Sequence, residues 1–206
     1  EAIELPPDGR TPFSSKGDRA RDYEWHRFWR TYYGDYLRML SKMARDRGVT
    51  VPFYHNLPGW IYGSGYEFPV NITMYEDLFG DKSEIIFGVD HIPEFLSHRN
   101  MHNDGIINDI TAAMQGNKPL FAAEFQCGSR EYHVVTNPRE LELFYKASIA
   151  HGLTGWNYYM FSQGRNPRHR GYSGQTFYWF APLTPEGECN STFPLIKRIS
   201  KIIKTS

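Results

Sequence analysis

The chain of 206 residues has the size of a single domain, and its 40% hydrophobic content is sufficient for a packed core. Basic and acidic residues balance to a formal net charge of zero, which argues against a surface for nucleic acid or an anionic membrane. No apolar run approaches the roughly 18 residues of a membrane-spanning helix, and no signal peptide is visible, so we expect a cytoplasmic protein.

Aromatic residues make up 16% of the chain. Large rings serve protein cores first and binding surfaces second, so this excess alone favours core packing over a sugar-binding cleft. The two cysteines, Cys127 and Cys189, match no metal-ligand spacing, and we expect free thiols. The histidines do not cluster at ligand spacings either. We therefore expect no metal ion and no cofactor.

Hydrophobic periodicity and turn residues predict helices and strands in alternation. The first residues, rich in Pro, Gly and Ser, are predicted as a loop over 1–22, and β/α units fill 23–206 as one domain. In chain order the predicted elements are a helix over 23–47, strands over 49–56 and 83–90, a helix over 101–115, a strand over 119–125, a helix over 137–152, a strand over 154–161 and a helix over 191–203.

Short buried strands that alternate with helices indicate a parallel sheet covered by helices. Two architectures fit this order, an open doubly wound sheet and a (β/α)8 TIM barrel. The first strand is not followed by a glycine-rich phosphate-binding turn, which argues against the nucleotide-binding folds. Polar residues end the strands and long loops follow them, as in barrels whose sites lie at the carboxyl ends of strands.

A complete barrel has eight strands and about 250 residues, whereas four strands are predicted here. Half a barrel leaves two open sheet edges and an uncovered face. The sequence therefore predicts the C-terminal half of a TIM barrel. Its N-terminal half is expected elsewhere, in the same or a separate chain.

Glu124 is the strongest candidate for a functional residue. It stands near the end of the apolar strand over 119–125, where an acid costs free energy unless it is hydrogen-bonded or paired. An ion pair with an arginine or a loop cap would explain it equally well from position alone.

Three segments together resemble the β-galactosidases of glycoside hydrolase family 35. "PLFAAEFQCG" is similar to the strand that carries the catalytic nucleophile of that family, and "NYYMFSQGRNP" is similar to its Tyr-Met-Phe-x-Gly-Gly-Thr-Asn segment. Gln163 and Arg165 depart from the second pattern, whereas Gly164 and Asn166 match it. "YWFAPLTPEGE" resembles a third segment, with Trp179 where the family has Asp. The match is strong over 118–200, and over 23–117 it is limited to layout and to "VTVPFYHN".

The resemblance implies a retaining exo-glycosidase that hydrolyses terminal β-D-galactosides through two carboxylates. It implies Glu124 as the nucleophile. Glu1 is the candidate acid/base. The alternative is that the acid/base belongs to a missing segment and Glu1 is not catalytic. Two alternatives stay open: a related exo-β-glucosidase or glucosaminidase, and a catalytically incomplete fragment that binds carbohydrate or is structural. The expected partner is a β-galactoside or oligosaccharide, with no nucleic acid and no membrane.

Further candidates for sugar contacts are polar residues at strand ends and aromatic residues near them. Each has an ordinary structural alternative, such as a turn residue, a core ring or a loop anchor. The predicted substrate-binding residues are Asn56, Asp90, Trp60, Trp156, Tyr159, Asn166 and Trp179.

Overall fold

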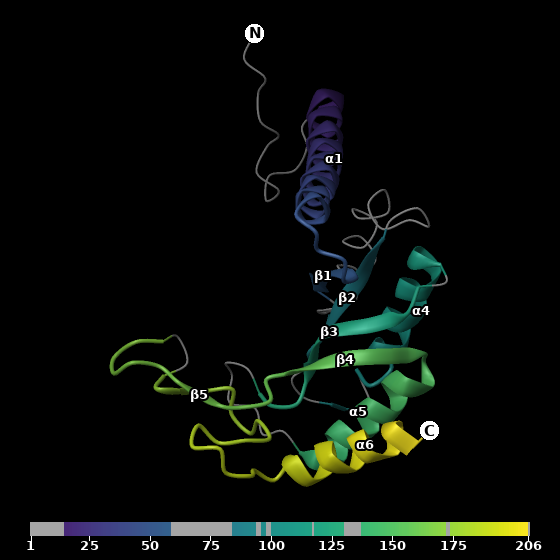
Figure 1. Ribbon diagram of the computed structural model, residues 1–206. Coiled ribbons are helices and arrows are strands. Elements are labelled where there is room, and N and C mark those ends of the chain that lie inside the picture. Colours follow the sequence, from purple (N-terminus) through teal and green to yellow (C-terminus); the bar gives the residue numbers. More distant parts are fainter. Residues whose placement is uncertain are drawn as a thin grey trace.

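The computed structural model describes residues 15–58, 84–93, 96–97, 100–116, 118–129, 137–171 and 174–205. Four parallel strands form its main sheet (Figure 1): β1 (Phe53–Pro58), β2 (Ile85–His91), β3 (Leu120–Gln126) and β4 (Leu153–Tyr159). They lie in the order β1-β2-β3-β4, so each strand pairs with the one that precedes it in the chain. The four predicted strands are confirmed.

Within the described ranges the sheet is open: β1 and β4 lie at its two ends and do not pair with each other. Half of a TIM barrel would be open in the same way, so the open edges alone do not decide against the predicted barrel. The alternation of strands and helices is common to open and closed parallel sheets, so it does not distinguish between them. What the structure supports is an α/β fold with an open four-stranded sheet.

Helices α4 (Asn103–Gln115), α5 (Pro138–Ala150) and α6 (Phe193–Thr205) lie along one face of the sheet (Figure 1). As predicted, Asn137 caps α5, where its side-chain oxygen accepts a hydrogen bond from the backbone N–H of Arg139 at 2.9 Å, and a proline opens the first turn. Gly116 ends α4 with φ at +64°, a backbone region that glycine adopts without a steric penalty.

The core fills the space between these helices and the sheet. One cluster gathers around β3, β4, α5 and α6, and the other around β1, β2 and α4. The most deeply buried large side chains include Tyr145, Phe87, Phe125, Leu57 and Val89. Tyr145 donates its hydroxyl proton to the carbonyl of Gln126 at 2.7 Å, which satisfies a polar group that would otherwise be buried without a partner.

Helix α1 (Lys16–Asp46) begins earlier than predicted and projects away from the sheet (Figure 1). Ser15 and Asp18 form a capping box, in which each side chain accepts a hydrogen bond from the other residue's backbone N–H. The loop predicted over 1–22 is therefore wrong from Lys16 onward, where this capping box starts the helix. At the other end, Arg45 binds the Glu84 carboxylate at 2.8 Å and lies over the ring of Phe53, which ties α1 to the sheet.

The region after β4 contains a short antiparallel pair that the sequence did not predict. β5 (Gly164–Arg165) pairs with β6 (Thr176–Phe177). Beyond β6, the carbonyl of Trp179 accepts the backbone N–H of Ser129 at 2.6 Å. This bond brings the segment after β6 beside the residues that follow β3.

An extra residue interrupts the ladder of β3. Val89 and Asp90 are consecutive in β2, yet they pair with Ala122 and Glu124. Ala123 is therefore unpaired in the β2 ladder, which defines a β-bulge. Such bulges turn the side chains that follow them toward a different side of the sheet.

The bulge changes which residues of β3 face the helices. Leu120 and Ala122 belong to the helix-side core, and in a regular strand the next residue on that face would be Glu124. Instead Phe125 enters the core, where it packs on Phe144 with ring centroids 4.7 Å apart. The opposite face of the sheet therefore receives Glu124.

We predict that packing at the bulge tolerates no added methyl group at Gly88. A Cβ there would lie 2.7 Å from Ala123 Cβ and 2.9 Å from Tyr54 Cδ2. Gly88→Ala should lower the free energy of unfolding by about 1–3 kcal/mol, and adding Ala123→Gly should recover part of this loss. A double-mutant cycle by urea denaturation measures the coupling. Gly34→Ala, inside α1 with ordinary contacts, is the control and should be stabilising. Additive effects of the two substitutions would contradict the contact.

We also predict that the two cysteines differ in reactivity. Cys127 is fully buried, and burial raises the pKa of its thiol, so the reactive thiolate is disfavoured at every pH at which the protein is handled. Cys189 is exposed. Ellman's reagent at pH 8 should modify one thiol per chain rapidly in the folded protein and both in urea. Cys189→Ser should remove the fast phase, and two fast thiols in the folded wild type would contradict the burial of Cys127.

Candidate functional site

Three polar side chains from three adjacent strands meet at the carboxyl edge of the sheet. Asn56 in β1 donates a hydrogen bond from Nδ2 to Oδ1 of Asp90 in β2 at 3.0 Å. The same Nδ2 lies 3.3 Å from Oε1 of Glu124 in β3. Asp90 is buried, Glu124 is half-buried and Asn56 is exposed. The three strand ends that the sequence singled out therefore do converge.

The amide of Asn56 suits this position because its Nδ2 carries two hydrogens and no charge. One hydrogen can serve each carboxylate, so the amide holds two acids close together. His55 precedes Asn56 in β1 and points to the other face of the strand. Burial lowers the pKa of its imidazole, so His55 is neutral at pH 7 and adds no charge. Glu124 is thus a carboxylate in a fixed position at a strand end, which suits a nucleophile or a base.

Tyr159 is the last residue of β4, at the same carboxyl edge of the sheet, and it contacts Tyr178. Its hydroxyl lies 2.8 Å from the hydroxyl of Tyr178, and the two rings meet edge to face with centroids 5.2 Å apart. Tyr178 and Phe180 have positive φ values of 58° and 61°, which bulky residues rarely adopt outside constrained sites. Tyr178 is not among the residues predicted from the sequence, although it opens the segment "YWFAPLTPEGE".

Trp156 lies on the other side of β4 from Tyr159. Its ring packs on Phe125 with centroids 5.4 Å apart, against the helix-side core. The structure therefore does not bring Trp156 together with Asn56, Asp90 and Glu124, contrary to its proposed sugar contact.

The remaining predicted residues have diverse positions. Asn166 donates from Nδ2 to the carbonyl of Gly174 at 2.8 Å, which holds the β5–β6 hairpin. Trp179 is half-buried, and its backbone lies beside the residues that follow β3. Glu1 and Trp60 lie outside the described residues, so their roles stay predictions.

The described segments contain no candidate metal site and no candidate membrane-spanning helix. Across them, no three His, Cys, Asp or Glu side chains are grouped as a metal site would require. Nor does any helix in this part of the chain combine the length and apolar content needed to cross a bilayer.

Comparison with known proteins gives one informative match. No family model matches the chain. Over 198 residues the chain is 43% identical to a protein from Ignavibacterium album named as a β-1,2-glucosyltransferase. The aligned region is 96% of this chain and 27% of that relative, so the chain spans about a quarter of the relative's length.

This match corrects the reaction predicted from the sequence. The relative is named for transfer of glucosyl groups, not for hydrolysis of galactosides, so the predicted β-galactosidase is wrong in both reaction and sugar. The transferase name likewise overturns the assignment to glycoside hydrolase family 35 and the TIM barrel predicted with it, which leaves an α/β fold with a four-stranded parallel sheet. The physical reason is that a carboxylate at a strand end serves many reactions at an anomeric carbon. Its motif does not specify whether water or a sugar hydroxyl receives the glycosyl group.

We predict that Asn56→Asp places a third carboxylate between Asp90 and Glu124. Mutual repulsion should lower the free energy of unfolding by about 1–3 kcal/mol at pH 7. Because repulsion favours protonated acids in the folded state, the deficit should shrink as the pH falls to 5. Urea denaturation at both pH values measures this.

Asn137→Asp is the matched control for this charge change. Asp caps a helix as well as Asn does, so the control should be nearly neutral at both pH values. Equal behaviour of the two variants would contradict the shared hydrogen bonds of Asn56.

Proposed function

We propose that this chain contributes the catalytic carboxylate of an enzyme that transfers a glucosyl group to the 2-hydroxyl of a sugar acceptor. The observation that carries the proposal is the 43% identity, across nearly all of this chain, to a protein named as a β-1,2-glucosyltransferase. The convergence of Asn56, Asp90 and Glu124 supports it, because transfer by double displacement needs a carboxylate aimed at the anomeric carbon.

In the proposed reaction Glu124 attacks C1 of a β-linked glucoside. The bond between C1 and the leaving oxygen breaks, and a covalent glucosyl ester forms on the carboxylate. The 2-hydroxyl of the acceptor then attacks C1 from the opposite face and releases Glu124. Two inversions give a β-linked product, which agrees with the linkage in the relative's name.

Each half of this reaction also moves one proton. The leaving oxygen gains a proton in the first step, and the acceptor hydroxyl loses one in the second. Glu1 remains our proposal for the group that gives and takes this proton. Asp90 has a different part: by holding Nδ2 of Asn56, it keeps the amide in place to donate to Glu124.

Transfer prevails over hydrolysis when an acceptor sugar, rather than water, occupies the space above the glucosyl ester. We propose that aromatic residues provide this acceptor surface, with Tyr159 and Tyr178 as its best-defined part. Trp60 and Trp179 are further candidates. An oligosaccharide acceptor stays the expected substrate class.

We predict that 2-deoxy-2-fluoro-β-glucosyl fluoride labels Glu124. The fluorine slows release of the glucosyl ester, so intact-mass spectrometry should show one added fluoroglucosyl group, located by peptide mapping between residues 119 and 129. Glu124→Gln should abolish the label and lower the rate of transfer by at least about 10³-fold.

Glu142→Gln, which changes a half-buried glutamate of α5 paired with Lys146 and Arg198, is the control and should label like the wild type. An aryl β-glucoside donor with glucose as acceptor should yield a β-1,2-linked disaccharide. A label on another residue, or an active Glu124→Gln variant, would refute the role of Glu124. Release of glucose alone would refute transfer.

A further inference from the structure

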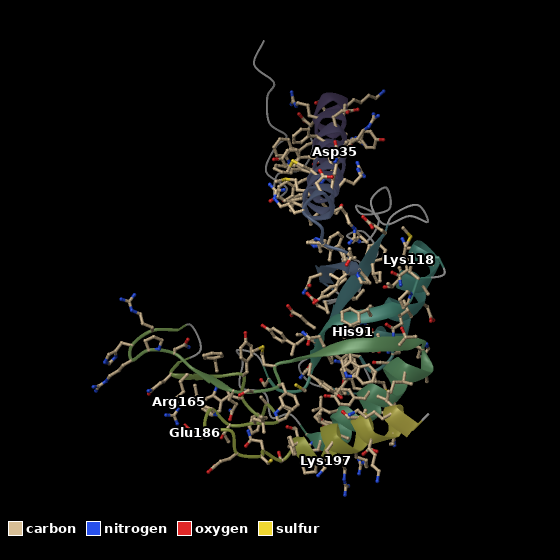
Figure 2. All side chains as sticks on the ribbon, in the orientation of Figure 1. Asp35, His91, Lys118, Arg165, Glu186 and Lys197 are labelled. Carbon is tan, nitrogen blue, oxygen red and sulfur yellow. The ribbon has the colours of Figure 1, made fainter. Side chains whose placement is uncertain are left out.

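A buried series of three hydrogen-bonded polar side chains lies on the helix side of the sheet, behind the candidate site. The Nδ1 of His91, at the end of β2, contacts Oδ1 of Asp104 in the first turn of α4. The other carboxylate oxygen of Asp104 accepts the hydroxyl proton of Ser148 in α5. His91, Asp104 and Ser148 have exposed fractions of 2%, 7% and 0%, so water contributes little to any of these groups. Figure 2 shows His91 within the layers of sheet and helices.

These three side chains are polar groups buried beside the apolar core clusters. A buried carboxylate is costly unless both of its oxygens find donors, and here each oxygen of Asp104 has one. The contacts join β2, α4 and α5 at a single point. Apolar residues of similar volume would cover the sheet there without this cost. The polar side chains instead orient His91, because hydrogen bonds depend on direction and apolar contacts do not.

The position of His91 connects it to the site. His91 follows Asp90 directly, and successive side chains in a strand point to opposite faces. Fixing His91 against the helices therefore fixes the direction of Asp90 on the open face. Asp90 in turn holds Nδ2 of Asn56, which also lies within hydrogen-bond distance of Glu124.

We propose that His91, held by Asp104 and Ser148, is a positioning residue that orients Asp90 and, through Asn56, Glu124. The inference rests on the proposed function for its catalytic consequence, although the geometric consequence is independent of it. His91 does not touch the reacting atoms in this scheme. Its contribution is a fixed strand end, and misplacement of a catalytic group by about 1 Å costs up to roughly 100-fold in rate.

The experiment compares three variants in the full chain. His91→Leu removes the donor to Asp104, and Ser148→Ala removes the second donor with little change of volume. His91→Asn keeps an N–H near the place of Nδ1 and tests for rescue. We expect the first two to lower kcat for glucosyl transfer by roughly tenfold with KM changed less than about twofold, and His91→Asn to recover most of the loss.

Gln115→Leu is the matched control for the loss of a buried polar group. Gln115 is 1% exposed and donates to the carbonyl of Pro119 at 2.9 Å, at the opposite, amino edge of β3. It should lower the melting temperature as the site variants do, while kcat is unchanged. A kcat loss in Gln115→Leu equal to that in His91→Leu, or wild-type kcat in His91→Leu, would overturn the proposal.

A second measurement keeps this inference separate from the proposed function. The side-chain amide of Asn56 gives its own pair of NMR signals, which report its hydrogen bonds to Asp90 and Glu124. These signals should shift in His91→Leu and stay in place in Gln115→Leu. If the wild type transfers no glucosyl group, the proposed function fails, and the amide signals still decide whether His91 positions Asp90. Unchanged signals in His91→Leu would overturn the inference.

Discussion

A regular strand cannot present Ala122 and Phe125 to one face of a sheet while Glu124 faces the other, because side chains alternate with a period of two. The extra residue in β3 removes this conflict. Phe125 then fills the helix-side core, and Glu124 reaches the hydrogen-bonding range of Asn56. Core packing and site geometry thus depend on the same irregularity, so neither is free to change without the other.

The sequence predicted the main elements because their signals are local. Periodicity located the four strands, and the Asn137–Pro138 pair located the start of α5. The bulge gave no such signal, since "LFAAEF" reads as an ordinary apolar run. The choice between an open sheet and a barrel was also beyond reach, because both have the same order of strands and helices. The early start of α1 does have a local signal, the Ser15–Asp18 spacing of a capping box.

The site shows the same division between local and non-local information. Asn56, Asp90 and Glu124 were predictable because carboxyl ends of parallel strands meet at one edge of a sheet. Trp156 and Tyr159 were grouped together because the register of β4 was unknown, and the structure puts them on opposite faces. Asp104 and Ser148 come from helices distant in sequence, so only the packed structure shows that they meet His91. The sugar and the reaction depend on contacts that no single strand encodes.

The order of the strands has a consequence for how the sheet is made. Among the described residues, each strand of the main sheet after β1 lies beside the one synthesised just before it, so none of these four strands has to be inserted between two others. The sheet can therefore grow during translation by adding one strand at a time to an existing edge. The pairing register of β3 shifts on both of its sides, against β2 and against β4. The edge that carries the candidate site would then acquire its final shape only when β4, the last strand of the described main sheet, has been added.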